Sequence, residues 1–307
     1  MQRLFSSQPL PDSMRGAVVA LGNFDGFHLG HQAVVARAVA LAAAKGVPAI
    51  VATFDPHPAR LFNPDAAPFR LTTLDQRQRL FGAAGAQAML VLEFDAALAG
   101  MHADAFVADL LVARLGVSGV VTGTDFVYGA KRSGNGATMQ AAADAHGFDY
   151  AIVSPVLADG EIVSSSRIRA ALQSGDCATA TRLLTRPFTI AGIVQHGDKV
   201  GRTIGFPTAN IDLGSYLRPL YGIYAVQGHL ADGRVLNGAA NIGIRPSFDP
   251  PKELLEPHFF DFAEDLYGQT IDVAFHAFLR GEGKYDTLEA LTAQIAADCD
   301  AARAIFS

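Results

Sequence analysis

Residues 22–31, GNFDGFHLGH, decide how the N-terminal half of the chain is interpreted. They follow an apolar run at 17–21 that predicts a β-strand and precede an Ala/Val-rich run that predicts a helix over 31–45. His28 and His31 therefore lie at a strand-to-helix corner, where free backbone N–H groups and the helix dipole favour anions. Two imidazole donors at such a corner suit a polyphosphate whose charge must be held while one phosphate bond breaks. The alternatives are two surface histidines or part of a metal site, and zinc is disfavoured because no third ligand has suitable spacing.

Beyond this corner, apolar runs at 49–54, 88–94 and 119–122 are separated by helix-like runs at 75–84 and 106–115. Apolar strands without alternation, separated by helices, predict a parallel sheet covered on both faces. The ligand of such a sheet binds at the carboxyl ends of its strands, over a switch in strand order. Three of the predicted strands end in GNFDGFHLGH, FDPHP and TGTDF. We therefore expect an α/β domain whose site is built from these three segments.

The pattern changes after about residue 186. Strand-like runs at 188–194, 222–230, 235–242, 254–260 and 270–279 follow one another with turn residues between them. They predict an antiparallel barrel or sandwich, and apolar residues at helical spacing predict a final helix over 287–305. We expect two domains, residues 1–185 and 186–307.

The composition argues against several classes of function. The chain has 307 residues, and half of them are apolar, which is enough to form two hydrophobic cores. Only 18% are charged, which argues against a long disordered tail. A net charge of −6 without a Lys/Arg block argues against nucleic acid and membrane surfaces as partners. The first residues lack the apolar core of a signal peptide, no run predicts a membrane span, and Cys177 and Cys299 fit neither a disulfide framework nor a zinc pattern. We expect a cytoplasmic protein that is a monomer or a weak oligomer.

The first domain carries four motifs that resemble those of one enzyme family. GNFDGFHLGH is similar to the GxFDxxHxGH signature of nucleotidyltransferases with a Rossmann-like fold, and VSSSRIR at 163–169 is similar to their second signature, ISSTRIR. FDPHP at 54–58 and TGTDFVYGAKRSGN at 122–135 resemble elements of the flavin-specific branch. In this order the blocks resemble the adenylyltransferase half of bifunctional riboflavin kinase/FAD synthetases, and the resemblance covers roughly the whole chain.

This resemblance implies that the first domain joins the AMP group of ATP to FMN and releases pyrophosphate. Both reactants are anionic, so orientation and charge neutralisation carry most of the catalysis. His28 and His31 are the expected catalytic residues. The expected ATP-binding residues are Gly22, Asn23, Phe24, Asp25, His28, His31, Ser164, Arg167 and Arg169. The expected flavin-binding residues are Phe54, Pro56, Pro58 and Asp125.

The second domain opens with GRTIGFPTAN at 201–210, which resembles the riboflavin kinase signature GRxLGFPTAN with Ile204 in place of leucine. It is not a Walker A loop, because no G-x-x-x-x-G-K-[S/T] occurs in the chain. The resemblance implies that Thr208 and Asn210 bind Mg²⁺ through oxygen, as a hard cation requires. The expected ATP-binding residues of this domain are Gly201, Arg202, Thr208 and Asn210.

LEPHFFDF at 255–262 resembles the family motif E-x-H-x-x-D-F and implies that Glu256 is the base. Its carboxylate would take the proton from the ribityl 5′-hydroxyl as this oxygen attacks the γ-phosphate. Pro257 offers no N–H to a strand ladder, so it puts the local strand in question. NIGIRPSF at 241–248 resembles the family's NIGTRPTF, and Arg280 and Tyr285 are expected to line the flavin pocket with Glu256.

Taken together, the motifs predict a Rossmann-like α/β nucleotidyltransferase domain followed by a β-barrel riboflavin kinase domain with a C-terminal helix. The substrates would be ATP, riboflavin and FMN. A tRNA-charging enzyme is disfavoured by the acidic charge and the lack of an RNA-binding module. A flavin carrier without catalysis is disfavoured because it need not keep His28, His31, Thr208, Asn210 and Glu256 together.

Overall fold

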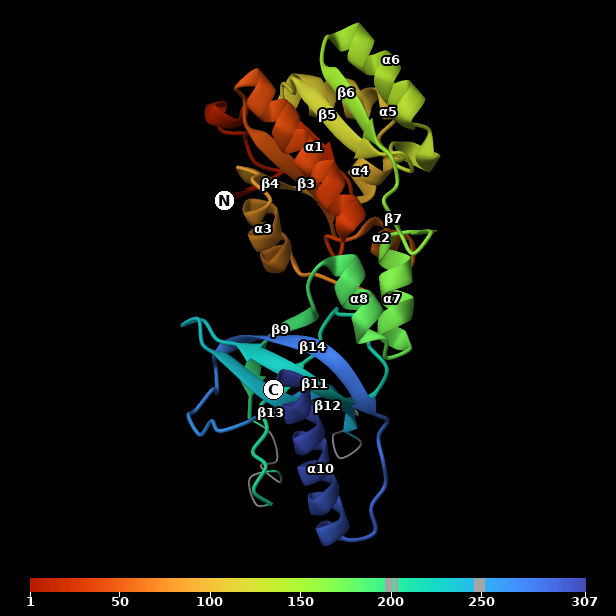
Figure 1. The fold of residues 1–307 in the computed structure, drawn as a ribbon. Coiled ribbons are helices and arrows are strands. Elements are labelled where there is room, and N and C mark those ends of the chain that lie inside the picture. Colours follow the sequence, from red (N-terminus) through yellow and green to blue (C-terminus); the bar gives the residue numbers. More distant parts are fainter. Residues whose placement is uncertain (197–200, 202–203, 246–251) are drawn as a thin grey trace. The chain divides into compact units, whose positions relative to one another are not determined.

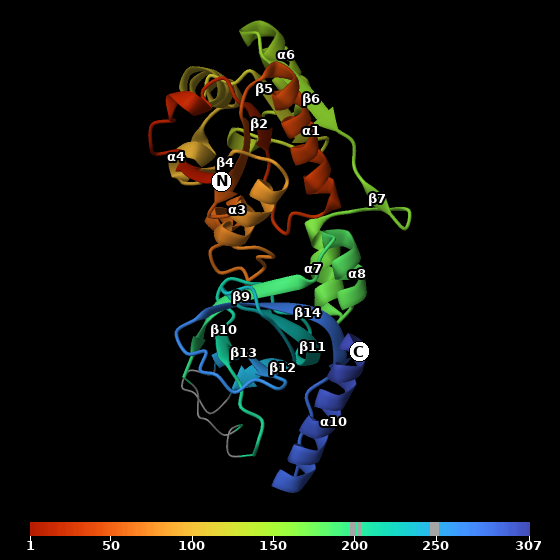
Figure 2. The ribbon, with the colours of Figure 1, turned by 60° about the vertical axis from the view of Figure 1, so that its left-hand side comes forward.

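The fold is taken from a computed structural model, and the description covers residues 1–196, 201, 204–245 and 252–307 (Figures 1 and 2). The chain forms two compact units. The first comprises Met1–Ala67 and Leu74–Ser164, and the second comprises Pro68–Thr73 and Ser165–Ser307. The break between units therefore lies N-terminal to residue 185, and a functional boundary at 185/186 stays a prediction.

The first unit is built on a six-stranded sheet in the order β1-β4-β3-β2-β5-β6, with every neighbouring pair parallel. The strands are β1 (Gln2–Phe5), β2 (Val18–Leu21), β3 (Ala49–Asp55), β4 (Ala88–Glu93), β5 (Gly119–Gly123) and β6 (Asp149–Val153). The predicted parallel sheet is confirmed, and the edge strands β1 and β6 are additions to it. Strand order reverses between β2 and β5, which makes their carboxyl ends the switch point of the sheet.

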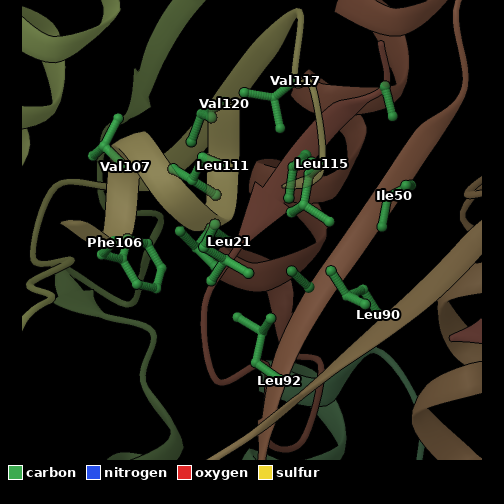
Figure 3. Close-up of a cluster of buried hydrophobic side chains, with 14 of the residues drawn as sticks. Leu21, Ile50, Leu90, Leu92, Phe106, Val107, Leu111, Leu115, Val117 and Val120 are labelled. Atoms are coloured by element: carbon green, nitrogen blue, oxygen red, sulfur yellow. The ribbon is translucent and has the colours of Figure 1, made fainter. Parts of the chain in front are cut away.

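Helices cover both faces of this sheet. Along β2, Val18 and Ala20 pack with α1 (Leu29–Lys45) and α3 (Leu74–Ala83). Val19 and Leu21 point the other way, as alternation along a strand requires, toward a π-helix, η2 (Phe106–Arg114), and α6 (Gly136–His146). Figure 3 shows Leu21, Ile50 and Leu90 of the sheet beside Phe106, Leu111 and Leu115 in the second of these layers. Both faces of the central strands are buried, which is why their sequences do not alternate.

The smaller elements of the first unit connect this framework. They are η1 (Asp12–Met14), α2 (Pro58–Phe62), α4 (Ala96–Gly100), α5 (Ala103–Ala105), η3 (Ala130–Arg132) and the hairpin β7 (Leu157–Ala158) and β8 (Glu161–Ile162). The hairpin turns at Asp159 and Gly160, both with positive φ, as a two-residue β-hairpin loop requires.

The second unit contains a closed antiparallel barrel in the order β10-β13-β12-β11-β14-β9. Its strands are β9 (Phe188–Gln195), β10 (Asn210–Asp212), β11 (Gly222–His229), β12 (Val235–Arg245), β13 (Lys252–Phe259) and β14 (Thr270–Arg280). The predicted barrel and final helix are confirmed, and the short β10 is an addition. The final helix, α10 (Leu288–Phe306), packs Cys299 and Ala302 on Ala225 and Ala239 of β11 and β12.

Two helices, α7 (Ser165–Gln173) and α8 (Cys177–Leu184), precede the barrel, and one segment from the N-terminal half joins it. In Pro68–Thr73, the Arg70 N–H donates to the Ser215 carbonyl over 3.1 Å, and the Arg70 carbonyl accepts from the Leu217 N–H over 2.8 Å. The chain thus enters the second unit once before α3 and again at α7. Within the described residues, no helix combines the length and the apolar character needed to cross a membrane.

Candidate functional site

The two histidines lie in contact at the N-terminus of α1. His28 is the N-cap residue, and its Nδ1 accepts from the backbone N–H of His31 over 3.4 Å. The two imidazole rings are stacked, with centroids 3.6 Å apart and planes inclined by 20°. Because the His28 Nδ1 accepts, a neutral His28 carries its proton on Nε2, where it is a hydrogen-bond donor. The corner predicted from the sequence is therefore present and presents imidazole and helix N–H groups together.

The loop before α1, which we call the GNFDGFH loop (residues 22–28), takes a strained path. Phe24 and Phe27 have φ of 50° and 46°, in the left-handed region that non-glycine residues avoid, and Gly26 between them has φ of 85°. Both phenylalanine rings are buried and pack edge-on against Phe81 of α3, at centroid distances of 5.7 and 5.1 Å. Phe24 also meets His31 edge-on at 5.3 Å. Aromatic packing therefore connects the loop, the histidine and α3.

The carboxylate of Asp25 is turned into the protein. Asp25 is 1% exposed, and its Oδ1 accepts from the Arg77 guanidinium over 3.1 Å. Arg77 also donates to the Thr53 hydroxyl over 3.2 Å, and this hydroxyl donates to the Asn23 carbonyl over 2.8 Å. The side chains of Asp25 and Phe24 thus hold the loop in its conformation. Contacts of these two residues with a nucleotide would therefore be made by their backbone atoms.

The segments expected to bind the flavin follow the two strands that flank β2. Phe54 is the penultimate residue of β3, is 8% exposed and packs edge-on against Phe94 at a centroid distance of 5.7 Å. Pro56 follows through a cis peptide bond and is exposed, and Pro58 begins α2. On the other side, Asp125 is exposed just beyond β5. In the strand order β3-β2-β5, the GNFDGFH loop therefore lies between the two predicted flavin segments.

The second signature, VSSSRIR, is divided between the two units. A Cβ at Gly30 would lie 3.6 Å from the Val163 carbonyl, so the start of the signature reaches the His28 corner, and Ser164 is the last residue of the first unit. Arg167 and Arg169 lie on α7, in the second unit. There the Arg169 Nε donates to the Phe69 carbonyl over 2.8 Å, and its guanidinium lies 5.2 Å from the Phe69 ring centroid. That these arginines join the histidine pair stays a prediction.

Gly30 offers a test of the histidine geometry. A Cβ at this position would lie 3.2 Å from the His28 Cε1, closer than ordinary van der Waals contact. We expect Gly30→Ala to remain folded, because alanine is well tolerated in a helix. Conversion of FMN to FAD should nevertheless slow, since the His28 ring must move. Gly100→Ala, a position with open space around its Cβ, is the matched control, and equal rates in both variants would contradict the prediction.

In the second unit, register aligns three polar residues across neighbouring strands. Glu256 of β13 pairs with Asn241 of β12. On its other side β13 pairs with β10, and the hydrogen bond from the Ala209 N–H to the Pro257 carbonyl, 2.9 Å, extends that ladder so that Asn210 comes opposite Glu256. Directly paired residues share a face of a sheet. Asn210, Glu256 and Asn241 therefore form one row, which we call the polar row.

The polar row lies on the outer face of the barrel. Ala239, two residues before Asn241 on the same strand, packs with Cys299 and Ala302 of α10, so this is the face on which α10 lies. Glu256 is half-buried there. Asn241 was not singled out from the sequence, although it opens the NIGIRPSF block that carried part of the resemblance.

Pro257 does not interrupt its strand. In an antiparallel ladder the N–H and C=O of one residue point to the same neighbour. The Pro257 carbonyl accepts from Ala209, so its missing N–H faces the β10 side, where β10 itself begins only at Asn210. Pairing with β12 continues through Ala240↔Pro257 to Gly238↔Phe259. The strand that Pro257 put in question is therefore intact, because the proline faces the side on which no donor is required.

Hydrogen bonds hold the GFPTAN segment (residues 205–210) next to the polar row. The Pro207 carbonyl lies 2.8 Å from the His258 Nδ1 and can only accept, so this nitrogen carries the proton. Gly201 accepts from the Phe206 N–H over 2.8 Å, and a Cβ on Gly201 would lie 3.6 Å from the Thr208 hydroxyl. Arg202 and residues 246–248 of NIGIRPSF lie outside the described residues.

Arg280 joins the end of β14 to α10. Its Nε and one terminal nitrogen bind the two carboxylate oxygens of Asp298 over 2.7 and 2.6 Å, and the pKa of Arg280 is raised by this pairing. Its guanidinium carbon lies 5.9 Å from the Tyr285 ring centroid. The two residues expected at the flavin pocket therefore lie together, beside the helix that covers the face with the polar row.

Comparison with known proteins gives two family matches. Residues 10–167 match the family model described as FAD synthetase, and residues 184–306 match the model described as riboflavin kinase. The chain is 42% identical over 306 residues to a bifunctional riboflavin kinase/FMN adenylyltransferase of Pseudomonas fluorescens, covering 99% of this chain and 98% of the relative. It is 40% identical over 291 residues to the protein of the same name from Escherichia coli, covering 95% and 93%.

A solved structure from Streptococcus pneumoniae resembles the whole fold. It has a TM-score of 0.87 and 28% identity and covers 99% of both chains. That protein is described as a macrolide-efflux protein, a description that neither the family models nor the curated relatives share.

Proposed function

The chain belongs to the family of bifunctional riboflavin kinases/FMN adenylyltransferases, and on this premise we propose which residues carry each of its two reactions. The enzyme phosphorylates riboflavin to FMN with ATP and adenylylates FMN to FAD with a second ATP. The observation that supports two independent sites is that the histidine corner and the polar row lie on different compact units. The histidine corner and the polar row then break different bonds of ATP.

For adenylyl transfer, the histidine corner binds the phosphates of ATP. A phosphate oxygen of FMN attacks the α-phosphorus, and the bond to pyrophosphate breaks. The charge that develops meets the His28 Nε2–H, the His31 ring and the first N–H groups of α1. Gly22, Asn23, Phe24 and Asp25 contribute through the backbone of the loop.

The remaining residues of this site are assigned by their place on the sheet. Phe54, Pro56, Pro58 and Asp125 bind the flavin on the two sides of the loop. Ser164, Arg167 and Arg169 bind the leaving pyrophosphate through charge-assisted hydrogen bonds. These assignments rest on the motifs and on the strand order β3-β2-β5.

For riboflavin phosphorylation, Glu256 takes the proton of the ribityl 5′-hydroxyl as its oxygen attacks the γ-phosphorus of ATP, and ADP leaves. Gly201 and Arg202 bind the nucleotide. Arg280 and Tyr285 hold the flavin over the face that carries the polar row.

Mg²⁺ is the metal that this site fits. The Thr208 hydroxyl and the Asn210 amide oxygen are hard oxygen donors, and the carboxylate of Glu256 stands opposite Asn210 in the ladder. Within the described residues no cluster of three or more His, Cys, Asp or Glu side chains offers a competing site. When bound, Mg²⁺ would neutralise phosphate charge. A cytoplasmic location, a monomeric or weakly oligomeric state and the absence of nucleic-acid and membrane partners stay predictions.

A two-step assay tests the proposal. The protein is incubated with riboflavin and Mg-ATP, and the flavins are separated by chromatography over time. We expect FMN to appear first and FAD to follow. Riboflavin recovered unchanged from the folded protein would contradict the proposal and support a flavin carrier.

A further inference from the structure

The ion pair between Asp25 and Arg77 is buried, and neither proposed reaction uses it. The two side chains are 2% and 1% exposed, and the atoms of the pair lie 3.1 Å apart. Burying two charges is costly, and a well-packed apolar pair often stabilises a protein as well or better. A contribution to stability therefore does not by itself explain why the chain has this ion pair. Its position next to the histidine corner suggests a role in the reaction at that corner.

The ion pair and two aromatic contacts join the GNFDGFH loop to α3. Arg77 and Phe81 stand four residues apart and so share one face of this helix. Arg77 binds Asp25, and Phe81 packs against both Phe24 and Phe27. Arg77 also donates to the Thr53 hydroxyl on β3, and this hydroxyl donates to the Asn23 carbonyl of the loop. Strand β3 therefore also helps to hold the loop.

These contacts fall on the strained part of the loop. Left-handed non-glycine residues persist only where the surrounding structure determines them, and Phe24 and Phe27 flank the Asp25–Gly26 pair on either side. The residue after Phe27 is His28, whose ring orientation depends on the direction in which the loop enters α1. An error in the loop would therefore be transmitted to both stacked imidazoles.

We propose that Arg77 is a positioning residue for adenylyl transfer, which acts by fixing Asp25 and thereby the GNFDGFH loop that aims His28 and His31. The proposal rests on the assignment of these histidines to the adenylyl site. Arg77 itself is 1% exposed, and its guanidinium binds Thr53 and Asp25, so it is placed to act through the loop. Its planar guanidinium serves Asp25 and Thr53 at once, which a lysine ammonium reproduces only in part.

The test compares Arg77→Met and Arg77→Lys with Arg114→Met in the full-length chain. Arg114 is an exposed arginine of the same unit whose guanidinium donates to the Gln8 carbonyl, so its replacement controls for the substitution itself. For each variant, kcat and the KM for ATP are measured in FMN adenylylation, riboflavin phosphorylation is measured in the same preparation, and thermal unfolding confirms that the protein is folded at the assay temperature.

We expect Arg77→Met to lower kcat for FAD formation by about 10²-fold, the scale of a misplacement of about 1 Å, with the KM for ATP changed much less. Arg77→Lys should lose less, and Arg114→Met should resemble the parent. Phosphorylation of riboflavin should be unchanged in all three. If folded Arg77→Met keeps the parent kcat, or if the folded variant loses both activities to the same extent, the positioning role is overturned.

Two further variants keep the outcome decisive. If Arg77→Met does not fold because the buried Asp25 carboxylate has lost its ion pair with Arg77, Asp25→Asn/Arg77→Met removes both charges. We expect this double variant to fold and still to adenylylate slowly, and normal adenylylation would overturn the proposal. His28→Ala, measured in parallel, tests the assignment of the histidines to the adenylyl site separately from the positioning role of Arg77. An active His28→Ala would overturn the site assignment, whereas an inactive His28→Ala with a fully active Arg77→Met would overturn only the positioning role.

Discussion

Replacing Glu256 with glutamine is expected to lower the rate of FMN formation from riboflavin by about 10²–10⁴-fold, the usual contribution of a general base. Glutamine keeps the shape of the side chain in the polar row but cannot accept the proton of the ribityl hydroxyl. Conversion of supplied FMN to FAD should be unaffected, because it is catalysed on the other unit. Both rates are measured by separating the flavins, and Glu256→Ala should give the same pattern.

Glu253 provides the matched control on the same strand. It stands an odd number of residues from Glu256 and so faces the opposite side of β13. Its carboxylate binds Arg218 over 2.8 Å and the Tyr221 hydroxyl. Burial alone would raise the pKa of Glu253, but these hydrogen bonds outweigh it and the pKa is lowered. Glu253→Gln should cost stability and leave the phosphorylation rate of the folded protein intact. A Glu256→Gln variant that phosphorylates riboflavin normally would refute the assignment of the base.

Removing the imidazole of His28 is expected to have the reverse effect. His28→Ala should lower FAD formation from FMN by about 10²–10³-fold, the cost of losing one preorganised donor to developing charge. Riboflavin phosphorylation should persist, so FMN should accumulate when riboflavin is supplied. The measurement is the ratio of FMN to FAD over time at saturating ATP.

His28 is also the N-cap of α1, and this second role must be separated from the first. Loss of a cap costs about 0.5–2 kcal/mol, so His28→Ala should also lower the unfolding temperature. His28→Asn restores a capping oxygen, and we expect it to recover stability but not FAD formation. His146→Ala, at an exposed position at the end of α6, controls for loss of a histidine elsewhere in the unit. If His28→Ala removed both activities from a folded protein, the two sites would not be independent.

Much of the architecture follows from local patterns. The central strands of the first unit were predicted because burial on both faces leaves them uniformly apolar, and Val18–Leu21 is buried at every position. The missed strands lack that signal. β1 and β6 pair on one side only and are partly exposed, and β10 spans three residues, too few for a pattern. The excursion of Pro68–Thr73 into the second unit has no local signal at all, because its bonds to Ser215 and Leu217 are made by backbone groups.

The sequence by itself determined the family, the parallel sheet and the barrel, and the residue types at the two sites, since a motif and a hydrophobic period are local properties of the chain. Tertiary structure alone decided that Asp25 faces Arg77, that Asn241 stands beside Glu256, and that Pro257 points its missing N–H where none is needed. The first depends on how α3 packs beside the loop, and the other two depend on strand order and register. Both are set by the simultaneous packing of segments distant in sequence, so no single stretch of residues contains them.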